Sequence, residues 1–95
     1  MKVENMITAK IIVLGRVQGV GFRVFTKKKA DELSVFGTVE NMNNGNVFIV
    51  AMAEKEKLDR FIEFCKKGPI SSKVKDITIE YIEESLSYSD FKIIN

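Results

Sequence analysis

The 95-residue sequence predicts an α+β fold of the ferredoxin-like βαββαβ type, with two helices on one face of an antiparallel sheet and a short extra C-terminal strand. Three observations predict it. Short β-branched runs alternate in polarity, two longer segments repeat apolar residues at helical spacing, and turn residues separate them. We expect residues 1–95 to form one domain, because a chain of this length fills one small core, with residues 1–7 as a flexible tail.

The first half of the chain predicts a strand, a helix and a hairpin. Residues 9–14 are apolar and β-branched, and Gly15 ends the run. Residues 22–34 follow with one apolar face, which is typical of a surface helix. Two strands at 36–42 and 46–53 then flank Asn44-Gly45, which favours a two-residue type I′ hairpin because both residues tolerate positive φ.

The second half predicts a helix and two strands. Residues 55–67 repeat apolar side chains at helical spacing, and Gly68-Pro69 ends the helix. Cys65 belongs to the apolar stripe, so we interpret it as a core residue and not as a nucleophile. Residues 74–82 predict a strand whose core face carries Lys75, Ile77, Ile79 and Tyr81, followed by a polar connection at 83–89 and a closing strand at 91–94.

Composition excludes several classes of protein. Histidine is absent and cysteine occurs once, which removes the common zinc clusters, Cys/His dyads and Ser/His/Asp triads, so we expect no metal and no cofactor. A net charge of +2 argues against a nucleic-acid partner, and the lysine run at 27–29 is interpreted as a solvated helix face. The sequence has no membrane-length apolar stretch and no signal-like N-terminus, so we expect a soluble, cytoplasmic protein without a membrane partner.

The strongest local signal lies where the first strand meets the first helix, at residues 15–23, GRVQGVGFR. Three glycines there allow several backbone N–H groups to face an anion, and the positive end of the helix dipole lies behind them. The chain has only three arginines, and two of them, Arg16 and Arg23, flank the loop. The pattern predicts a site for phosphate or carboxylate, although a tight turn without a ligand would also use these glycines.

This segment resembles the signature of the acylphosphatase family. The likeness continues through residues 37–41, GTVEN, and through Asn44-Gly45, Gly68-Pro69 and residues 91–93, in the expected order. The resemblance implies an enzyme that hydrolyses acyl phosphates, as its small-molecule partners, to a carboxylate and inorganic phosphate without a metal.

The resemblance also implies roles for individual residues. Gln18, Gly19, Val20 and Gly21 would form the phosphate-binding loop, Arg23 would bind the phosphate, and Asn41 would position the attacking water. Arg23 and Asn41 are thus the catalytic candidates. Turn capping is the alternative role for Asn41. Neither residue is a base near neutral pH, so the substrate's own phosphate oxygen would take the proton from water.

Three positions depart from the family pattern, and two rival functions remain. Ser34-Val35 replaces the usual Gly-Leu helix exit, and Glu40 stands where basic or neutral residues are common, although strand alternation should point it away from Asn41's side.

The main rival is a non-catalytic module that binds an anion or a partner. An RNA-binding domain is a weaker rival, because Phe48 is the only aromatic residue on the expected central strands. A monomer is expected, but nothing in the sequence fixes the oligomeric state or the acyl group.

Overall fold

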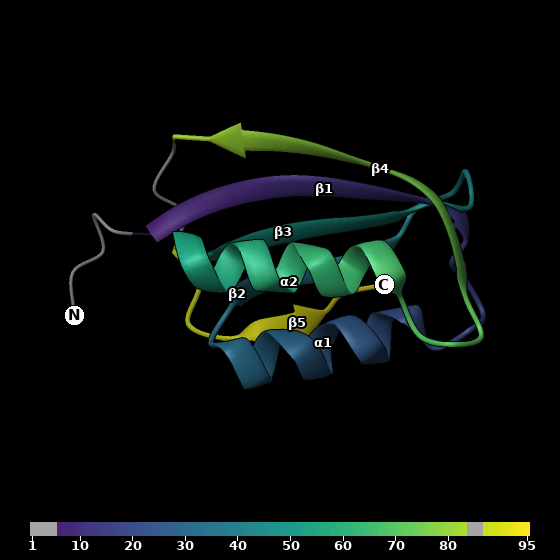
Figure 1. Ribbon diagram of the computed structural model, residues 1–95, viewed down its shortest axis with the longest axis horizontal. Coiled ribbons are helices and arrows are strands. Elements are labelled where there is room, and N and C mark those ends of the chain that lie inside the picture. The colour runs from purple at the N-terminus through teal and green to yellow at the C-terminus, as the bar shows by residue number, and fades with distance from the viewer. Residues whose placement is uncertain (1–5, 84–86) are drawn as a thin grey trace.

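The computed structural model describes residues 6–83 and 87–95 and has the predicted architecture. Its elements are β1 (Met6–Arg16), α1 (Phe22–Leu33), β2 (Phe36–Asn41), β3 (Val47–Glu54), α2 (Lys55–Lys67), β4 (Lys73–Ile82) and β5 (Phe91–Ile93). The strand order is β4-β1-β3-β2-β5. All neighbours are antiparallel except β5, which runs parallel to β2. Figure 1 shows both helices on the same face of the sheet.

The core lies between the sheet and the two helices. Alternate residues of the central strands β1 and β3 supply one wall, and the apolar stripes of α1 and α2 supply the other. Phe61 of α2 meets Phe91 of β5 edge to face, with ring centroids 5.9 Å apart. Cys65 is buried as predicted, and burial raises the pKa of its thiol far above the ordinary value. The side chain of Cys65 thus belongs to the core, as its place on the apolar stripe predicts.

The first strand is longer than the sequence predicts. Met6 and Ile7 were expected in the flexible tail, but they belong to β1 and pair with Glu54 and Ala53 of β3. Ile7 also packs against the core, which explains why the pairing extends this far. The rest of the expected tail, residues 1–5, and residues 84–86 of the polar connection lie outside the described residues.

The β2–β3 hairpin is not the predicted type I′ turn. Its ends pair through Met42, whose N–H donates to Asn46 O at 2.8 Å, and Gly45 N donates to Met42 O at 3.2 Å. Gly45 has a φ of +94°, whereas Asn44 is not among the described residues with positive φ. The carboxamide oxygen of Asn44 instead accepts a hydrogen bond from the N–H of Asn46. This is the three-residue loop in which a glycine follows an ordinary turn.

The core face of β4 differs from the predicted one because a β-bulge interrupts the pairing of β1 with β4. Leu14 pairs with Asp76 and Gly15 with Val74, so the register shifts between them. Gly15 has a φ of +130°, and a side chain there would collide with the carbonyl of Lys73. Because of the shift, Val74 packs against the core and Lys75 is exposed, contrary to the predicted alternation. Ile77 and Ile79 contact the core as expected, but Tyr81 is mostly exposed.

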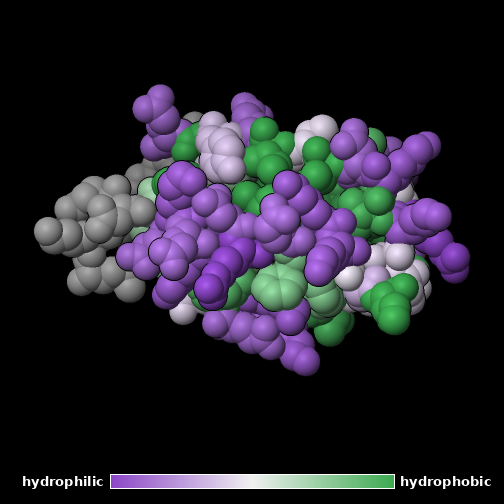
Figure 2. Space-filling model, in the orientation of Figure 1, coloured by the Kyte–Doolittle hydropathy of each residue, from purple (hydrophilic) through white to green (hydrophobic). Residues whose placement is uncertain are grey.

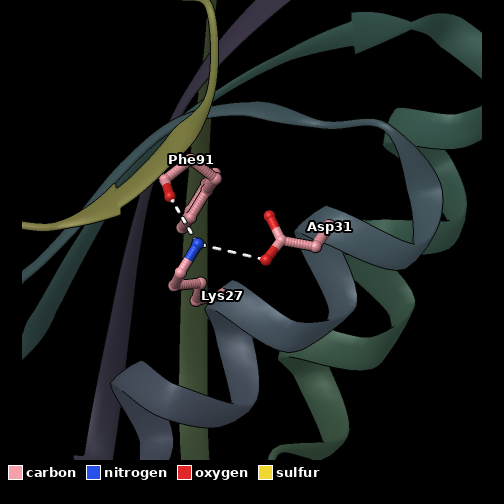
Figure 3. Close-up of polar contacts among 3 residues, drawn as sticks. All are labelled: Lys27, Asp31 and Phe91. Atoms are coloured by element: carbon pink, nitrogen blue, oxygen red, sulfur yellow. Dashed lines mark hydrogen bonds and ion pairs between the residues drawn. The ribbon is translucent and has the colours of Figure 1, made fainter.

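The lysine run of α1 has a structural role beyond solvation. Lys27 Nζ donates to Asp31 Oδ2 at 3.1 Å and to the Phe91 carbonyl at 2.9 Å, which ties α1 to β5 (Figure 3). Lys29 lies 4.4 Å from the ring centroid of Phe64 on α2. Figure 2 shows a mostly hydrophilic surface over the two helices. Within the described residues, neither helix is long and apolar enough to span a membrane.

Candidate functional site

Three connections meet at one end of the sheet, namely β1–α1, β2–β3 and α2–β4 (Figure 1). Gln18 in the first connection uses its side-chain amide to donate to Met42 O and Asn46 O of the hairpin, both at 2.8 Å. Ser71 in the third donates from its hydroxyl to Val20 O at 2.8 Å. These bonds hold the predicted phosphate loop between the other two connections, so the candidate residues from distant parts of the sequence share one end of the molecule.

The loop at residues 17–21 is anchored at its apolar positions and open at its glycines. Val17 is fully buried and Val20 packs against the core. Gly19 and Gly21 have φ values of +71° and +80°, and a Cβ at either would meet no atom within 4 Å. Both glycines are thus required by backbone conformation and not by crowding. The space in front of them is free for a ligand.

The first turn of α1 is arranged as an anion site. Gly21 is its N-cap, no side chain caps it, and its first turn contains no acidic residue. In the described part of the chain, no backbone carbonyl or side chain accepts from the N–H groups of residues 18–21. Arg23 is the second helical residue, half-buried, and pairs with no described carboxylate. Free donors, a helix N-terminus and a guanidinium together favour a phosphate.

Asn41 is the last residue of β2 and lies on the helix-covered face of the sheet. It pairs with Val47, whose side chain is fully buried, and its N–H donates to the carbonyl of Asn95. Its Oδ1 atom is buried and has no hydrogen-bond partner among the described residues. An orphaned acceptor of this kind is costly unless something donates to it. Glu40 pairs with Phe48 and, by alternation, lies on the opposite face.

Sequence reasoning missed the residues that hold the site together. The Gln18 side chain had been assigned only to the phosphate loop, but both of its observed hydrogen bonds go to hairpin carbonyls. Ser71 had no signal beyond its position after Gly68-Pro69, and nothing pointed to a bond from Asn41 to Asn95. These contacts are long-range, so no local pattern encodes them. Across the described ranges 6–83 and 87–95, no group of three or more His, Cys, Asp or Glu could hold a metal ion.

The family model and the curated relatives of this chain name the same family. The family model described as Acylphosphatase matches residues 9–93. The chain is 40% identical over 88 residues to an acylphosphatase from Vibrio parahaemolyticus, covering 93% of each chain. It superimposes on a solved acylphosphatase from Coxiella burnetii with a TM-score of 0.93 and 35% identity, covering 99% of this chain and 98% of the other. It also matches T. kodakarensis HypF with a TM-score of 0.82 and 29% identity, covering 94% of this chain but 12% of that one.

Proposed function

We propose a mechanism on the premise that the chain belongs to the acylphosphatase family and hydrolyses acyl phosphates to a carboxylate and inorganic phosphate. In this mechanism the loop of Gln18, Gly19, Val20 and Gly21 and the side chain of Arg23 bind the phosphoryl group. Asn41 positions the water that attacks it. No metal takes part.

The proposed binding of phosphate rests on the N-terminus of α1, which no side chain caps. Backbone N–H groups of residues 18–21 are free to donate to phosphate oxygens, and Arg23 adds a planar charged donor. Charge on the moving phosphoryl group is spread over its equatorial oxygens, and donors fixed around those oxygens stabilise the transition state. The Gln18 side chain, which is bound to the hairpin, would keep the loop in this shape.

The buried, unpartnered Oδ1 of Asn41 is the observation that supports the water's position. A water that donates one hydrogen to this oxygen would have a lone pair free to attack phosphorus. The P–O bond to the acyl group breaks, and its electron pair leaves on the carboxylate. The water's second proton passes to a phosphate oxygen, so the products are the carboxylate and dihydrogen phosphate, and no protein base is needed.

The test is release of phosphate from benzoyl phosphate by the purified protein in the presence of a chelator. We expect full activity with the chelator, because the charge is stabilised by Arg23 and N–H groups. Activity that disappears with the chelator and returns with magnesium would overturn the metal-free mechanism. We also expect kcat to be nearly flat between about pH 5.5 and 8, apart from ionisation of the substrate phosphate, since the proposed site contains no histidine, cysteine or carboxylate side chain. A sharp bell would reveal an unrecognised acid or base.

We also propose a monomer in the cytoplasm that has no nucleic-acid partner. A single buried cysteine supports a reducing compartment, and a net charge of +2 argues against a nucleic-acid partner. Cell fractionation and size-exclusion chromatography would test it directly.

A further inference from the structure

Beside the phosphate loop lies an open hollow of about 680 Å³ that the mechanism does not use. Its wall includes Arg16, Lys73 and Lys75, together with Ile70 and Ser71 of the α2–β4 connection. We propose that this cationic hollow binds the acyl part of the substrate and favours acyl phosphates that carry a second anionic group. The inference rests on the proposed function, because it adds a subsite to the same phosphate site.

The hollow adjoins the phosphate loop along the chain and through one hydrogen bond, although none of residues 17–21 lines it. Gly15 and Arg16, which line it, directly precede residues 17–21 in the chain. Ser71, also in its wall, donates to the carbonyl of Val20 inside the loop. In the proposal, a substrate whose phosphate is held by the loop extends its acyl group toward the hollow.

The three cations are placed against electrostatic preference. Arg16 of β1 stands directly opposite Lys73 of β4 in the register, and like charges at such a pair are destabilising. The bulge exposes Lys75 as a third positive charge in the same wall. None of the three pairs with a described carboxylate, although five other lysines form ion pairs with neighbours in or beside the helices. The nearest acidic residue in sequence, Asp76, does not line the hollow, and its Oδ1 accepts from Ile77 N.

An anion between these cations would relieve their repulsion. The side chain of Ile70 is fully exposed in the same wall and offers an apolar contact to methylene groups. The hollow therefore offers both apolar contact and positive charge to an acyl chain that carries an anionic group. The same chemistry gives Arg16 a role, which the phosphate site alone does not.

The experiment compares hexanoyl phosphate with adipoyl monophosphate, which has the same chain length and a terminal carboxylate. The readout is the ratio of their kcat/KM values within each variant, so that general damage to the site cancels. For the unmodified protein we expect a ratio of about five to ten in favour of adipoyl monophosphate, falling as ionic strength rises. In R16Q/K73Q/K75Q the ratio should fall to about one.

The matched control is K10Q/K28Q/K92Q, which also removes three positive charges. Its three lysines are exposed and lie outside the hollow and outside the ion pairs. It should keep the ratio of the unmodified protein. A ratio near one in the unmodified protein, or an equal fall in both triple variants, would overturn the subsite. If thermal unfolding shows that R16Q/K73Q/K75Q is not folded, the single variant K75Q at the bulge replaces it. The kcat/KM ratio should then fall by a smaller factor. Failure to hydrolyse hexanoyl phosphate at all would instead contradict the proposed mechanism.

Discussion

The two helices cover the same face of the sheet, but their ends differ. α2 follows the usual pattern, with Glu56 in its first turn, Lys66 and Lys67 in its last, and Gly68 as its C-cap. α1 has no acidic residue in its first turn, no basic residue in its last, and Ser34 in left-handed conformation at its C-cap. α2 therefore compensates its own dipole, whereas α1 leaves its positive N-terminus free.

The proposed phosphate site gives a reason for this difference at only one end of α1. Its N-terminus adjoins the phosphate loop and Arg23, so an acidic side chain there would compete with the substrate. Its C-terminus lies at the other end of the helix, away from the candidate site. Correcting the N-terminal departure should therefore impair activity, whereas correcting the C-terminal one should leave activity unchanged.

The largest effect is expected from Arg23→Ala. Loss of the guanidinium should lower kcat by at least about 10²-fold and weaken inhibition by inorganic phosphate, because a charge-assisted donor to the phosphoryl group is removed. Arg23→Lys should recover little, since an ammonium lacks the planar fork. Steady-state kinetics with benzoyl phosphate measures both. Near-normal turnover in the alanine variant would show that the phosphate lies elsewhere.

Asn41→Ala should separate the water from the phosphate. We expect kcat to fall by about 10²-fold while inhibition by phosphate is largely kept, because only the water's position is lost. Asn43→Ala, an exposed neighbour in the hairpin, is the matched control and should behave like the unmodified protein. If Asn41→Ala weakened phosphate binding as much as Arg23→Ala does, the proposed division between the two residues would be wrong.

Gly19→Val and Gly21→Val test the loop that precedes α1. Both positions have positive φ and open space, so valine should cost about 1–2 kcal/mol of stability and also occupy the space proposed for the anion. Gly45→Val is the control, since Gly45 in the hairpin has a φ of +94° with equally open space. All three variants should lose similar thermal stability, but only the loop variants should lose phosphate binding and activity. Normal phosphate binding in Gly19→Val would indicate that the glycines serve the turn alone.

Local patterns predicted the regular elements well because burial periodicity decides them. The helix at 55–67 has its predicted bounds, and the strand order follows from the fold type. The hairpin type and two of the four predicted core residues of β4, Lys75 and Tyr81, were predicted wrongly. At the hairpin a local side-chain contact decides the turn, because Asn44 Oδ1 accepts from Asn46 N. In β4 a contact between strands displaces Lys75, because the bulge at Gly15 shifts the register.

The sequence proposes the residues of the candidate site, but it does not predict the contacts that hold them in place. Glycine spacing and Arg23 mark the loop in the sequence, since backbone conformation and charge are local properties. The bonds of Gln18 to the hairpin and of Ser71 to Val20 join residues more than twenty positions apart. The orphaned oxygen of Asn41 likewise depends on the packing around it.

A smaller effect is expected when α1 is given the acidic residue that α2 already has. Val24 is the third residue of α1 and is 65% exposed, so Val24→Glu should stabilise the helix by about 0.3–1 kcal/mol. The same charge should weaken phosphate inhibition and raise KM. Val24→Gln separates charge from helix propensity and should leave KM unchanged. The reciprocal variant, Glu56→Gln in α2, should lose a similar amount of stability with unchanged kinetics. Unchanged KM in Val24→Glu would mean that this N-terminus does not face the substrate.

The smallest effect on activity is expected at the other end of α1. Ser34 has φ and ψ of +57° and +45°, a conformation that glycine adopts without the strain caused by a side chain. Ser34→Gly should therefore raise stability by about 0.5–1 kcal/mol, or about 4–8 °C in thermal midpoint for each kcal/mol. Ser34→Ala is the control, since it keeps the strain and should not stabilise. Neither variant should change kcat or KM. If Ser34→Gly stabilised the protein but slowed turnover, the C-terminal departure of α1 would also serve function. The N-terminal departure would then not be the only one with a functional reason.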